Sequence, residues 1–394
     1  MADSDEEPTT QDETVVTKYR TVGTVVNKVL EAVVKKCEVG ASVRTVCEFG
    51  DQKIKEELAP CMKRDKQIKK GVAFPTCISV NNCICHFSPL ASEPDYVLKD
   101  EDVVKVDLGA HLDGFIAVVA HTIVVGASNE KKITGKKAKA ILAAHYASEV
   151  ALRLLRPDNE TYKITDAIQK VSSIYGCKPI EGMLSHQLKQ NRIDGEKTII
   201  QNPNHMQKKD HEKFTFEPYE VYAMDVLISS GEGVGREQDT RVSIYKRTEE
   251  TYMLKLQTSK KFLSEVTNKY ANMPFNLRYF EDEKRAKMGV NECVNHKLVE
   301  PFQVLYEKPS EFVAQFKFTA LVMPNRTIKI TGLPFEESIY ECETVIEDPE
   351  IKALLETEVD TKKKKKKPGQ AKAMEVDGEN KASGETKMEV DASA

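Results

Sequence analysis

Two segments of the sequence share a pattern that few folds accommodate. Each is a strand-like apolar run that carries one acid and leads into a glycine-containing turn: DVVKVDLGAHLDG at 102–114 and EVYAMDVLISSGEG at 220–233. The embedded acids are Asp107 and Asp225. This repetition predicts a duplicated α+β unit with pseudo-twofold symmetry. Helix-strand-strand-helix in each half would place helices outside a curved antiparallel sheet.

The first of these segments reads as a β-hairpin. The stretch VDLGAHLDGFIAVVAHT (106–122) alternates on both sides of Asp113-Gly114, and this dipeptide suits a tight hairpin turn. Position 107 then lies opposite 120, and position 118 is its diagonal neighbour on the same face. A carboxylate at 118 would let two acids bridge a pair of metal ions, but residue 118 is Val118. Asp107 is therefore either a metal ligand or a satisfied structural acid.

The chain ends differ in composition from its middle. With 394 residues and 40% hydrophobic content, the chain exceeds one ordinary single-core domain, and its net charge of −4 predicts no partner. Residues 1–16 are acidic and are expected to be disordered, as is a lysine-rich tail at 359–394. We expect the folded domain at 17–345 and a short helix at 346–358. The tail holds an unbroken lysine run: Lys362, Lys363, Lys364, Lys365, Lys366 and Lys367.

Helical spacing of apolar residues predicts helices at 17–37, 43–70, 136–157, 163–176 and 258–298, and a strong final strand at 311–324. No apolar run approaches the roughly 20 residues that a membrane helix needs, so no membrane insertion is expected. The odd number of cysteines, nine, and the lack of an apolar opening segment favour reduced thiols in the cytosol or nucleus.

Five segments in order resemble the methionine aminopeptidases, specifically their eukaryotic type II branch: AFPTCISVNNCICHFSP, VDLGAHLDG, LSHQLKQNRI, VYAMDV and AQFKFT. The resemblance covers roughly residues 17–345. It implies the pita-bread fold with a helical insertion at about 254–308. It also implies a dinuclear metal site built from two Asp, one His and two Glu.

The resemblance assigns a role to individual positions. Asp107 matches the first Asp and His186 matches the His, whereas Val118 replaces the bridging Asp. Asp225 stands where the first Glu belongs, and Lys317 replaces the last, bridging Glu. On the substrate side, His86 matches one histidine of the family and Asp194 stands at the place of a second.

These replacements change the charge at the ligand positions by three units. Divalent metals on oxygen ligands need the summed negative charge of those ligands. Lys317 repels a second cation and can itself pair with Asp107 or Asp225. We therefore expect no cofactor, no metal and no catalytic residue, with His186 a pocket histidine or a former ligand. Alternatives are a weak mononuclear site, or zinc on Cys83, Cys85 and His86, although no second ligand cluster lies nearby.

Further segments are closer to one non-peptidase branch of this family, the proliferation-associated proteins that bind ErbB receptors. They include KKDHEK, SSGEG, FEDEK, LYEK and the lysine-run C-terminus. This resemblance implies binding to ribosomal and other structured RNA, to the large ribosomal subunit, and to receptor and transcription-corepressor proteins. It implies roles in ribosome biogenesis, translation regulation, growth control and corepression, in the cytoplasm, nucleus and nucleolus. The alternative is a metal-dependent aminopeptidase with altered ligands.

Lysine and arginine clusters are the candidate RNA-binding residues. The Lys362 to Lys367 run is either a solvated tail or a nuclear signal and phosphate-binding arm. Two further groups are either RNA contacts or solvated surface: Lys63, Arg64, Lys66, Lys69 and Lys70, and, in the insertion, Lys255, Lys260, Lys261, Arg278, Lys284, Arg285 and Lys287. No sheet-stacking aromatic motif is present, so RNA binding would be electrostatic and strongly salt-dependent.

Overall fold

The computed structural model describes residues 7–63, 65 and 67–359 of the chain. Its helices are α1 (Glu13–Val34), α2 (Val43–Leu58), α3 (Gly135–Leu154), α4 (Thr161–Ile174), α5 (His205–Asp210), α6 (Gln257–Lys269), α7 (Glu283–Asn295) and α8 (Pro349–Glu356), with 3-10 turns η1 (Leu277–Tyr279) and η2 (Glu337–Ile339). Its longer strands are β1 (Lys70–Val80), β3 (Val103–Leu112), β4 (Phe115–Val124), β8 (Val221–Ser229) and β14 (Val313–Met323). The short strands are β2 (Cys83–Cys85), β5 (Lys178–Pro179), β6 (Leu184–Gln187), β7 (Thr198–Ile200), β9 (Arg236–Glu237), β10 (Ile244–Arg247), β11 (Phe275–Asn276), β12 (Val299–Pro301), β13 (Leu305–Tyr306) and β15 (Arg326–Lys329).

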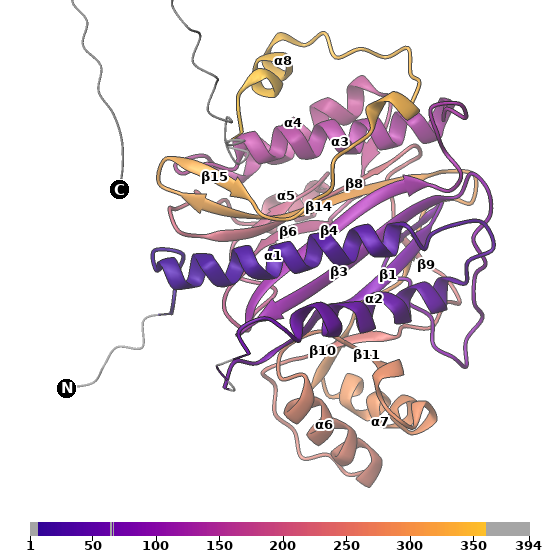
Figure 1. The fold of residues 1–394 in the computed structure, drawn as a ribbon, viewed down its shortest axis with the longest axis vertical. Helices are drawn as coiled ribbons and strands as arrows, with labels where there is room; N and C mark the ends of the chain where they lie inside the picture. Colours follow the sequence, from indigo (N-terminus) through magenta and orange to yellow (C-terminus); the bar gives the residue numbers. More distant parts are fainter. Residues whose placement is uncertain (1–6, 64, 66, 360–394) are drawn as a thin grey trace, which may run out of the picture. The chain divides into compact units, whose positions relative to one another are not determined.

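One large antiparallel sheet organises the described residues. Its nine strands run β1-β3-β4-β14-β8-β6-β7, with β15 paired to β14 and β5 paired to β8. Helices α1 and α2 cover the β1-β3-β4 half, and α3 and α4 cover the β14-β8 half (Figure 1). The predicted α+β architecture, with helices outside an antiparallel sheet, is confirmed.

The two halves are built in parallel, but not in the predicted helix-strand-strand-helix order. In each half two helices come first: α1 and α2 precede β1 to β4, and α3 and α4 precede β6 to β8. Strand β3 returns directly into β4 through Asp113 and Gly114, whose φ angles of 57° and 79° suit a tight hairpin turn. Strand β8 instead pairs with β14, which follows the insertion. The 220–233 segment is therefore not a tight hairpin, because its turn leads into the insertion.

Several predicted helix ends differ from the structure, and the largest differences are at the start of α1 and the end of α2. Helix α1 begins at Glu13 rather than residue 17, capped by the Asp12 carboxylate, which accepts a hydrogen bond from the Thr14 amide at 2.8 Å. Val15 and Val16 belong to the first turn of this helix and are buried, so the expected disorder of 1–16 does not hold for residues 13–16. Helix α2 ends at Leu58 rather than at residue 70, because residues 59–69 form the connection to β1, which begins at Lys70.

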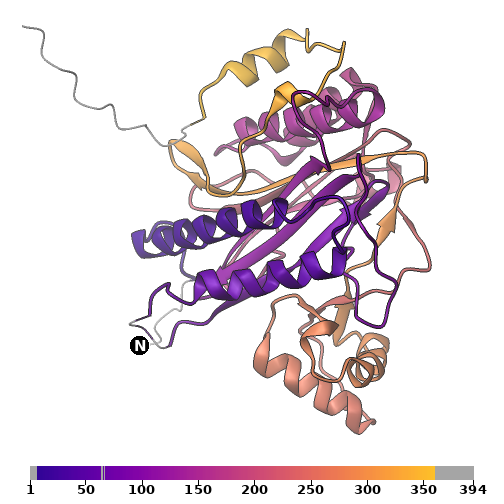
Figure 2. The same ribbon diagram turned by 45° about the vertical axis from the view of Figure 1, so that its right-hand side comes forward.

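The insertion forms its own small core beside the main sheet. Helices α6 and α7 pack around buried Phe262, Phe275 and Val290, next to a three-stranded sheet in the order β11-β10-β12. Figures 1 and 2 show this unit at the edge of the molecule, away from α3 and α4. None of the helices among the described residues is both long and apolar enough to cross a membrane.

Successive side chains of the central strands point to opposite faces of the sheet. Met224 of β8 and Phe318 of β14 belong to the core beneath α3 and α4, and Val106 of β3 belongs to the core beneath α1 and α2. Because side chains alternate along a strand, Asp107, Asp225 and Lys317 point to the opposite face. The former ligand positions thus share the helix-free side of the sheet.

Candidate functional site

The sheet register places three predicted site residues in one row. Asp107 on β3 lies opposite Ala120 on β4, as the hairpin predicted. Ala120 in turn faces Lys317 on β14, and Lys317 faces Asp225 on β8. His186 on β6 lies opposite Ala223, two residues from Asp225 along β8. Segments more than 200 residues apart in the sequence therefore meet here only because β14 joins the two halves.

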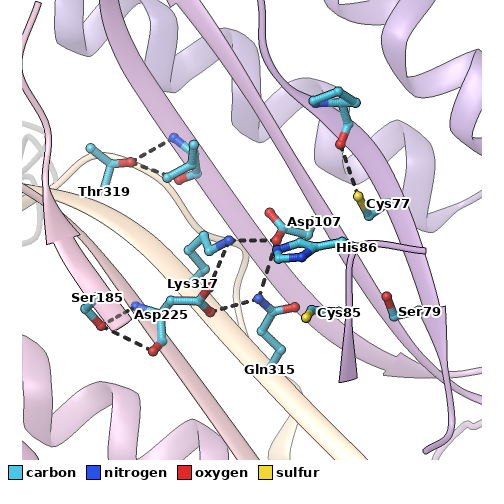
Figure 3. A network of polar contacts seen from close by, with 12 residues as sticks. Cys77, Ser79, Cys85, His86, Asp107, Ser185, Asp225, Gln315, Lys317 and Thr319 are labelled. Carbon is cyan, nitrogen blue, oxygen red and sulfur yellow. Dashed lines mark hydrogen bonds and ion pairs between the residues drawn. The ribbon is translucent and has the colours of Figure 1, made fainter. Parts of the chain in front are cut away.

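Lys317 occupies the centre of this row (Figure 3). Its Nζ lies 2.6 Å from Oδ2 of Asp107 and 2.9 Å from Oδ2 of Asp225, and all three residues are at least nine-tenths buried. The ammonium also lies 5.4 Å from the centre of the Phe74 ring, a favourable cation–π distance. The expected ion pair of Lys317 is thus formed with both acids at once.

Gln315 completes the network and was missed by the sequence reading. Its Nε2 donates to Oδ1 of Asp225 at 2.8 Å and approaches Oδ2 of Asp107 at 3.4 Å (Figure 3). The available signal was its position two residues before Lys317, which places both side chains on one face of β14. An amide there bridges the two carboxylates without adding charge.

Neighbouring side chains also fix the backbone of Asp225. Its amide donates to Oγ of Ser185 at 2.9 Å, and its carbonyl accepts from Nε2 of Gln201 at 2.5 Å. Buried backbone groups need such partners. The carboxylate is therefore held in place by groups that do not depend on a metal.

The electrostatics of the row follow from burial and mutual attraction. Burial disfavours the charged form of Lys317, but the carboxylates of Asp107 and Asp225 outweigh it and raise the pKa of Lys317 above its ordinary value. Burial raises the pKa of Asp225, and Lys317 opposes that rise. The amine is therefore protonated at neutral pH. A divalent cation would have to displace this ammonium and meet its repulsion at close range.

Val118 faces apolar neighbours instead of supplying a ligand. It is 2% exposed, and its Cγ1 lies so close to Gly109 that a Cβ there would approach it to 2.7 Å. Its amide donates to Oγ1 of Thr319 at 2.9 Å, and its carbonyl accepts from Thr331 at 2.8 Å. With a methyl-bearing side chain at this position and a lysine at 317, the residues present do not fit a dinuclear metal centre.

The predicted histidines flank the row without completing a ligand set. Burial and the nearby Lys317 ammonium lower the pKa of His186 and lower that of His86 to about 4. His86 has a φ of 62°, contacts the carbonyl of Gln303 through Nδ1 at 3.1 Å, and lies between the Phe74 and Phe302 rings. Within the described residues, no group of three or more His, Cys, Asp or Glu side chains is arranged to hold a metal ion.

The remaining predicted site residues, Asp194, Cys83 and Cys85, have ion-pair or hydrogen-bond partners other than Lys317. Asp194 is exposed and forms an ion pair with Lys246 of β10, and its charge contributes only a small rise to the pKa of His186, which burial lowers. The Cys83 and Cys85 thiols are buried near backbone carbonyls, at 3.9 Å from Cys85 O and Gln303 O respectively.

The candidate RNA-binding residues divide into three groups. Exposed side chains without an ion pair among the described residues are Lys63, Lys69, Lys255, Lys260, Lys261, Lys284 and Arg285. Lys261 and Arg285 line one groove of about 360 Å³ between α6 and α7. Arg64, Lys66 and the run Lys362, Lys363, Lys364, Lys365, Lys366 and Lys367 lie outside the described residues.

Three candidates have partners within the protein, and of these only Arg278 is too buried to serve as an RNA contact. The Arg278 side chain is 7% exposed and pairs with Asp51 of α2, joining the insertion to the main domain. Lys287 pairs with Glu93 at 2.6 Å. The Nζ of Lys70 donates to the carbonyls of Ala59 and Cys61 at 3.1 and 2.7 Å, just beyond the end of α2.

Known proteins share this fold and much of this sequence. A protein of Arabidopsis thaliana named ERBB-3 binding protein 1 is 46% identical over 384 residues, covering 96% of this chain and 94% of its own. A Schizosaccharomyces pombe protein named curved DNA-binding protein is 42% identical and covers 90% and 94%. The solved structure of a thermophilic Arx1 superposes with a TM-score of 0.82 at 32% identity, covering 88% of this chain and 99% of that one.

Residues 17–243, more than half of the chain, match the family Peptidase_M24, metallopeptidase family M24. The match spans β3, β4 and β8, the strands that carry Asp107, Val118 and Asp225. The relative named as an ErbB-3 binding protein covers nearly the whole chain, and its name describes a binding role. The chain belongs to metallopeptidase family M24, in the group of the ErbB-3 binding proteins.

Proposed function

We propose that this chain is a non-catalytic scaffold that binds structured RNA, above all ribosomal RNA on the large ribosomal subunit. In this proposal it acts in ribosome biogenesis, translation regulation, growth control and transcriptional corepression, in the cytoplasm, nucleus and nucleolus. The observation that carries the non-catalytic part is the Lys317 ammonium, which lies between Asp107 and Asp225 where a bridging carboxylate would serve a metal.

Surface charge supports the binding part of the proposal. Lys261 and Arg285 line the same groove of the insertion, which also holds Lys269 and the acids Glu265, Glu281 and Asp282, and Lys255, Lys260 and Lys284 are exposed without an ion pair among the described residues. Unpaired exposed cations can replace the counterions of a nucleic-acid backbone. The name of the fission yeast relative points to nucleic acid, and that of the Arabidopsis relative to a receptor. A receptor is therefore included as a proposed partner, and corepressor proteins are included because of the resemblance to the proliferation-associated proteins.

The first experiment tests catalysis. The purified full chain is incubated with Mn²⁺, Co²⁺ or Zn²⁺, its bound metal is measured by mass spectrometry, and release of methionine from Met-Ala-Ser is followed. We expect neither stoichiometric metal nor turnover, while an active type II methionine aminopeptidase treated identically shows both. Full metal occupancy together with methionine release would establish the alternative, an aminopeptidase with altered ligands.

The second experiment tests RNA binding. RNA crosslinked to the chain in cells is sequenced, and binding to ribosomal RNA fragments is measured at several salt concentrations for two variants. One is Lys261→Gln with Arg285→Gln, and the other lacks residues 362–367. We expect weaker binding, and a slope of log affinity against log salt that is smaller by about 0.7–0.9 for each lost phosphate contact.

A matched control removes two lysines that already have acidic partners. Lys131 pairs with Asp100 at 2.5 Å and Lys136 pairs with Glu311 at 2.6 Å, on a different part of the surface. Lys131→Gln with Lys136→Gln should leave the affinity nearly unchanged. Equal affinities and equal salt slopes for the wild type and both test variants would contradict the proposed RNA-binding surfaces.

A further inference from the structure

A cavity of about 190 Å³ lies on the helix side of the sheet; Lys317 is among its lining residues, whereas Asp107 and Asp225 are not. Its floor is formed by His121 of β4 and by Phe316 and Phe318 of β14, and His145 of α3 forms one wall. Its cover is the segment 332–335. Strands β4 and β14 are the central strands where the two halves meet, between α1 and α3 (Figure 1).

The two histidines of this cavity have unused hydrogen-bonding groups. His121 is 8% exposed and His145 is partly buried, yet neither ring has a hydrogen-bond partner among the described residues. Their ring nitrogens are not among the buried unpartnered atoms of the described residues, so they are accessible to a ligand or to water. Burial lowers the pKa of each ring to about 4, so both are neutral at physiological pH. A neutral imidazole carries one donor and one acceptor.

The charged groups at the cavity are already paired with one another. Glu149 accepts from Arg153 at 2.8 Å and lies 3.2 Å from Nζ of Lys329. The lining therefore has no uncompensated carboxylate that would select a cation. What remains open to a ligand is the pair of neutral imidazoles.

Aromatic rings complete the walls. His145 stacks on Phe335 with ring centres 3.9 Å apart, and both histidines meet Phe316 edge-on at 5.2 and 5.6 Å. The volume exceeds the roughly 150 Å³ that admits benzene and is below the roughly 300 Å³ of a drug-sized pocket. Such a space accepts one planar ring or a fused pair.

We propose that this cavity binds an uncharged planar nitrogen heterocycle of the nucleobase type, whose edge donors and acceptors pair with the His121 and His145 rings. The aromatic walls suit a flat ligand, and the two rings suit an edge that both donates and accepts hydrogen bonds. The heterocycle can come as a free base or as a base presented by an RNA strand. This site goes beyond the proposed function, and binding of a free base does not depend on it.

The experiment uses the full chain with adenine, guanine, cytosine and uracil as probes. Saturation-transfer NMR detects binding of each base, and ¹⁵N spectra of histidine-labelled protein report on the ring nitrogens. We expect at least one base to bind and to shift the ring signals of His121 and His145. Absence of saturation transfer from all four bases would overturn the proposal, as would equal binding of toluene, which has the shape without the polar edge.

Variants test the role of the rings. His121→Phe keeps a flat ring but removes both hydrogen-bonding nitrogens, and we expect at least a tenfold loss of affinity. His121→Gln keeps a donor and an acceptor and should retain more of the binding, while the exposed His205→Phe on α5 serves as matched control. Unchanged affinity in both His121→Phe and His145→Phe would refute the site, and the wild-type ¹⁵N spectra decide the question if a variant fails to fold.

The two sources of the ring are separated by competition. A short single-stranded RNA and the same strand carrying abasic positions are each added to the complex with the free base. If RNA presents the base, the intact strand displaces the free base and the abasic strand does not. If neither strand displaces it, the cavity serves the free heterocycle, and the RNA-binding proposal is unaffected.

Discussion

Two lysines are buried on the helix-free face of the same sheet, and their surroundings differ sharply. Lys317 lies between two carboxylates, which raise its pKa. Lys105 on β3 is 0% exposed, and its Nζ donates to the carbonyls of Asn81 and Val313, each at 3.0 Å. With no carboxylate beside it, burial lowers the pKa of Lys105 to about 8.

The comparison of the two lysines shows what Asp107 and Asp225, which stand at the former ligand positions, contribute to a buried ammonium. Backbone carbonyls satisfy the donors of an ammonium but offset only part of the cost of removing its charge from water. The acids at 107 and 225 supply the missing compensation for Lys317. Lys317 is therefore matched to an anionic site and acts as a covalently attached cation, whereas Lys105 joins strand and loop by hydrogen bonds.

The largest expected effect is the loss of stability when the Lys317 ammonium is removed from between its two carboxylates. Lys317→Met leaves Asp107 and Asp225 buried beside each other without a cation, and removing one partner of a buried pair costs about 3–5 kcal/mol. We expect the free energy of unfolding, measured by urea denaturation at pH 7, to fall by that amount.

A second variant shows whether charge is the cause. In Lys317→Met combined with Asp107→Asn and Asp225→Asn, no net charge remains in the row, and most of the lost stability should return. If the triple variant is as unstable as the single one, packing of the lysine chain matters more than its charge, and the cation comparison fails.

The next effect is on the pH dependence of stability, which should differ between the two lysines. The folded pKa of Lys105 is about 8, below its ordinary value of 10.5. Between these values the unfolded chain holds a proton that the folded chain has released, so stability rises with pH. The wild type should gain about 3 kcal/mol over Lys105→Met as the pH increases from 8 to 10.5.

The stability difference between wild type and Lys317→Met should depend on pH in the opposite way to that of Lys105→Met. Its folded pKa is raised, so folded and unfolded chains are both protonated at this residue below pH 10.5, and its contribution is lost only at higher pH. The stability difference between wild type and Lys317→Met should stay constant from pH 8 to 10. A flat curve for Lys105→Met as well would show that Lys105 remains charged throughout this range.

Local patterns were enough to predict part of this site. The Asp113-Gly114 turn set the register of β3 and β4, so the pairing of Asp107 with Ala120 followed from a few neighbouring residues. The exchange of acids for Val118 and Lys317 followed from the resemblance to the methionine aminopeptidases and needed no structure. The buried Lys105 was missed, although its place two residues before Asp107 in a valine-rich strand was visible in the sequence.

Long-range pairing could not be predicted in the same way. Strand β14 contacts both β4 and β8, and only this pairing brings Gln315 and Lys317 between acids that are 118 residues apart. His121 and His145 likewise meet because α3 packs over the sheet. Arg278 looked like a surface cation because nothing local revealed its partner on α2, Asp51.

The smallest expected effect is a change in the pKa of His86, to which Lys317 contributes and Lys105 does not. Burial lowers the pKa of His86 to about 4, and Lys317 is the next contribution in the same direction, whereas Lys105 does not contribute. Lys317→Met removes that repulsion and exposes the ring to the Asp225 carboxylate, which favours the protonated form. We expect the pKa of His86, followed by NMR titration of its ring protons, to rise by about one unit in Lys317→Met. It should not change in Lys105→Met, because that ammonium has its own carbonyl partners. Equal shifts in the two variants would mean that the histidine responds to general loosening of the sheet and not to the cation at 317.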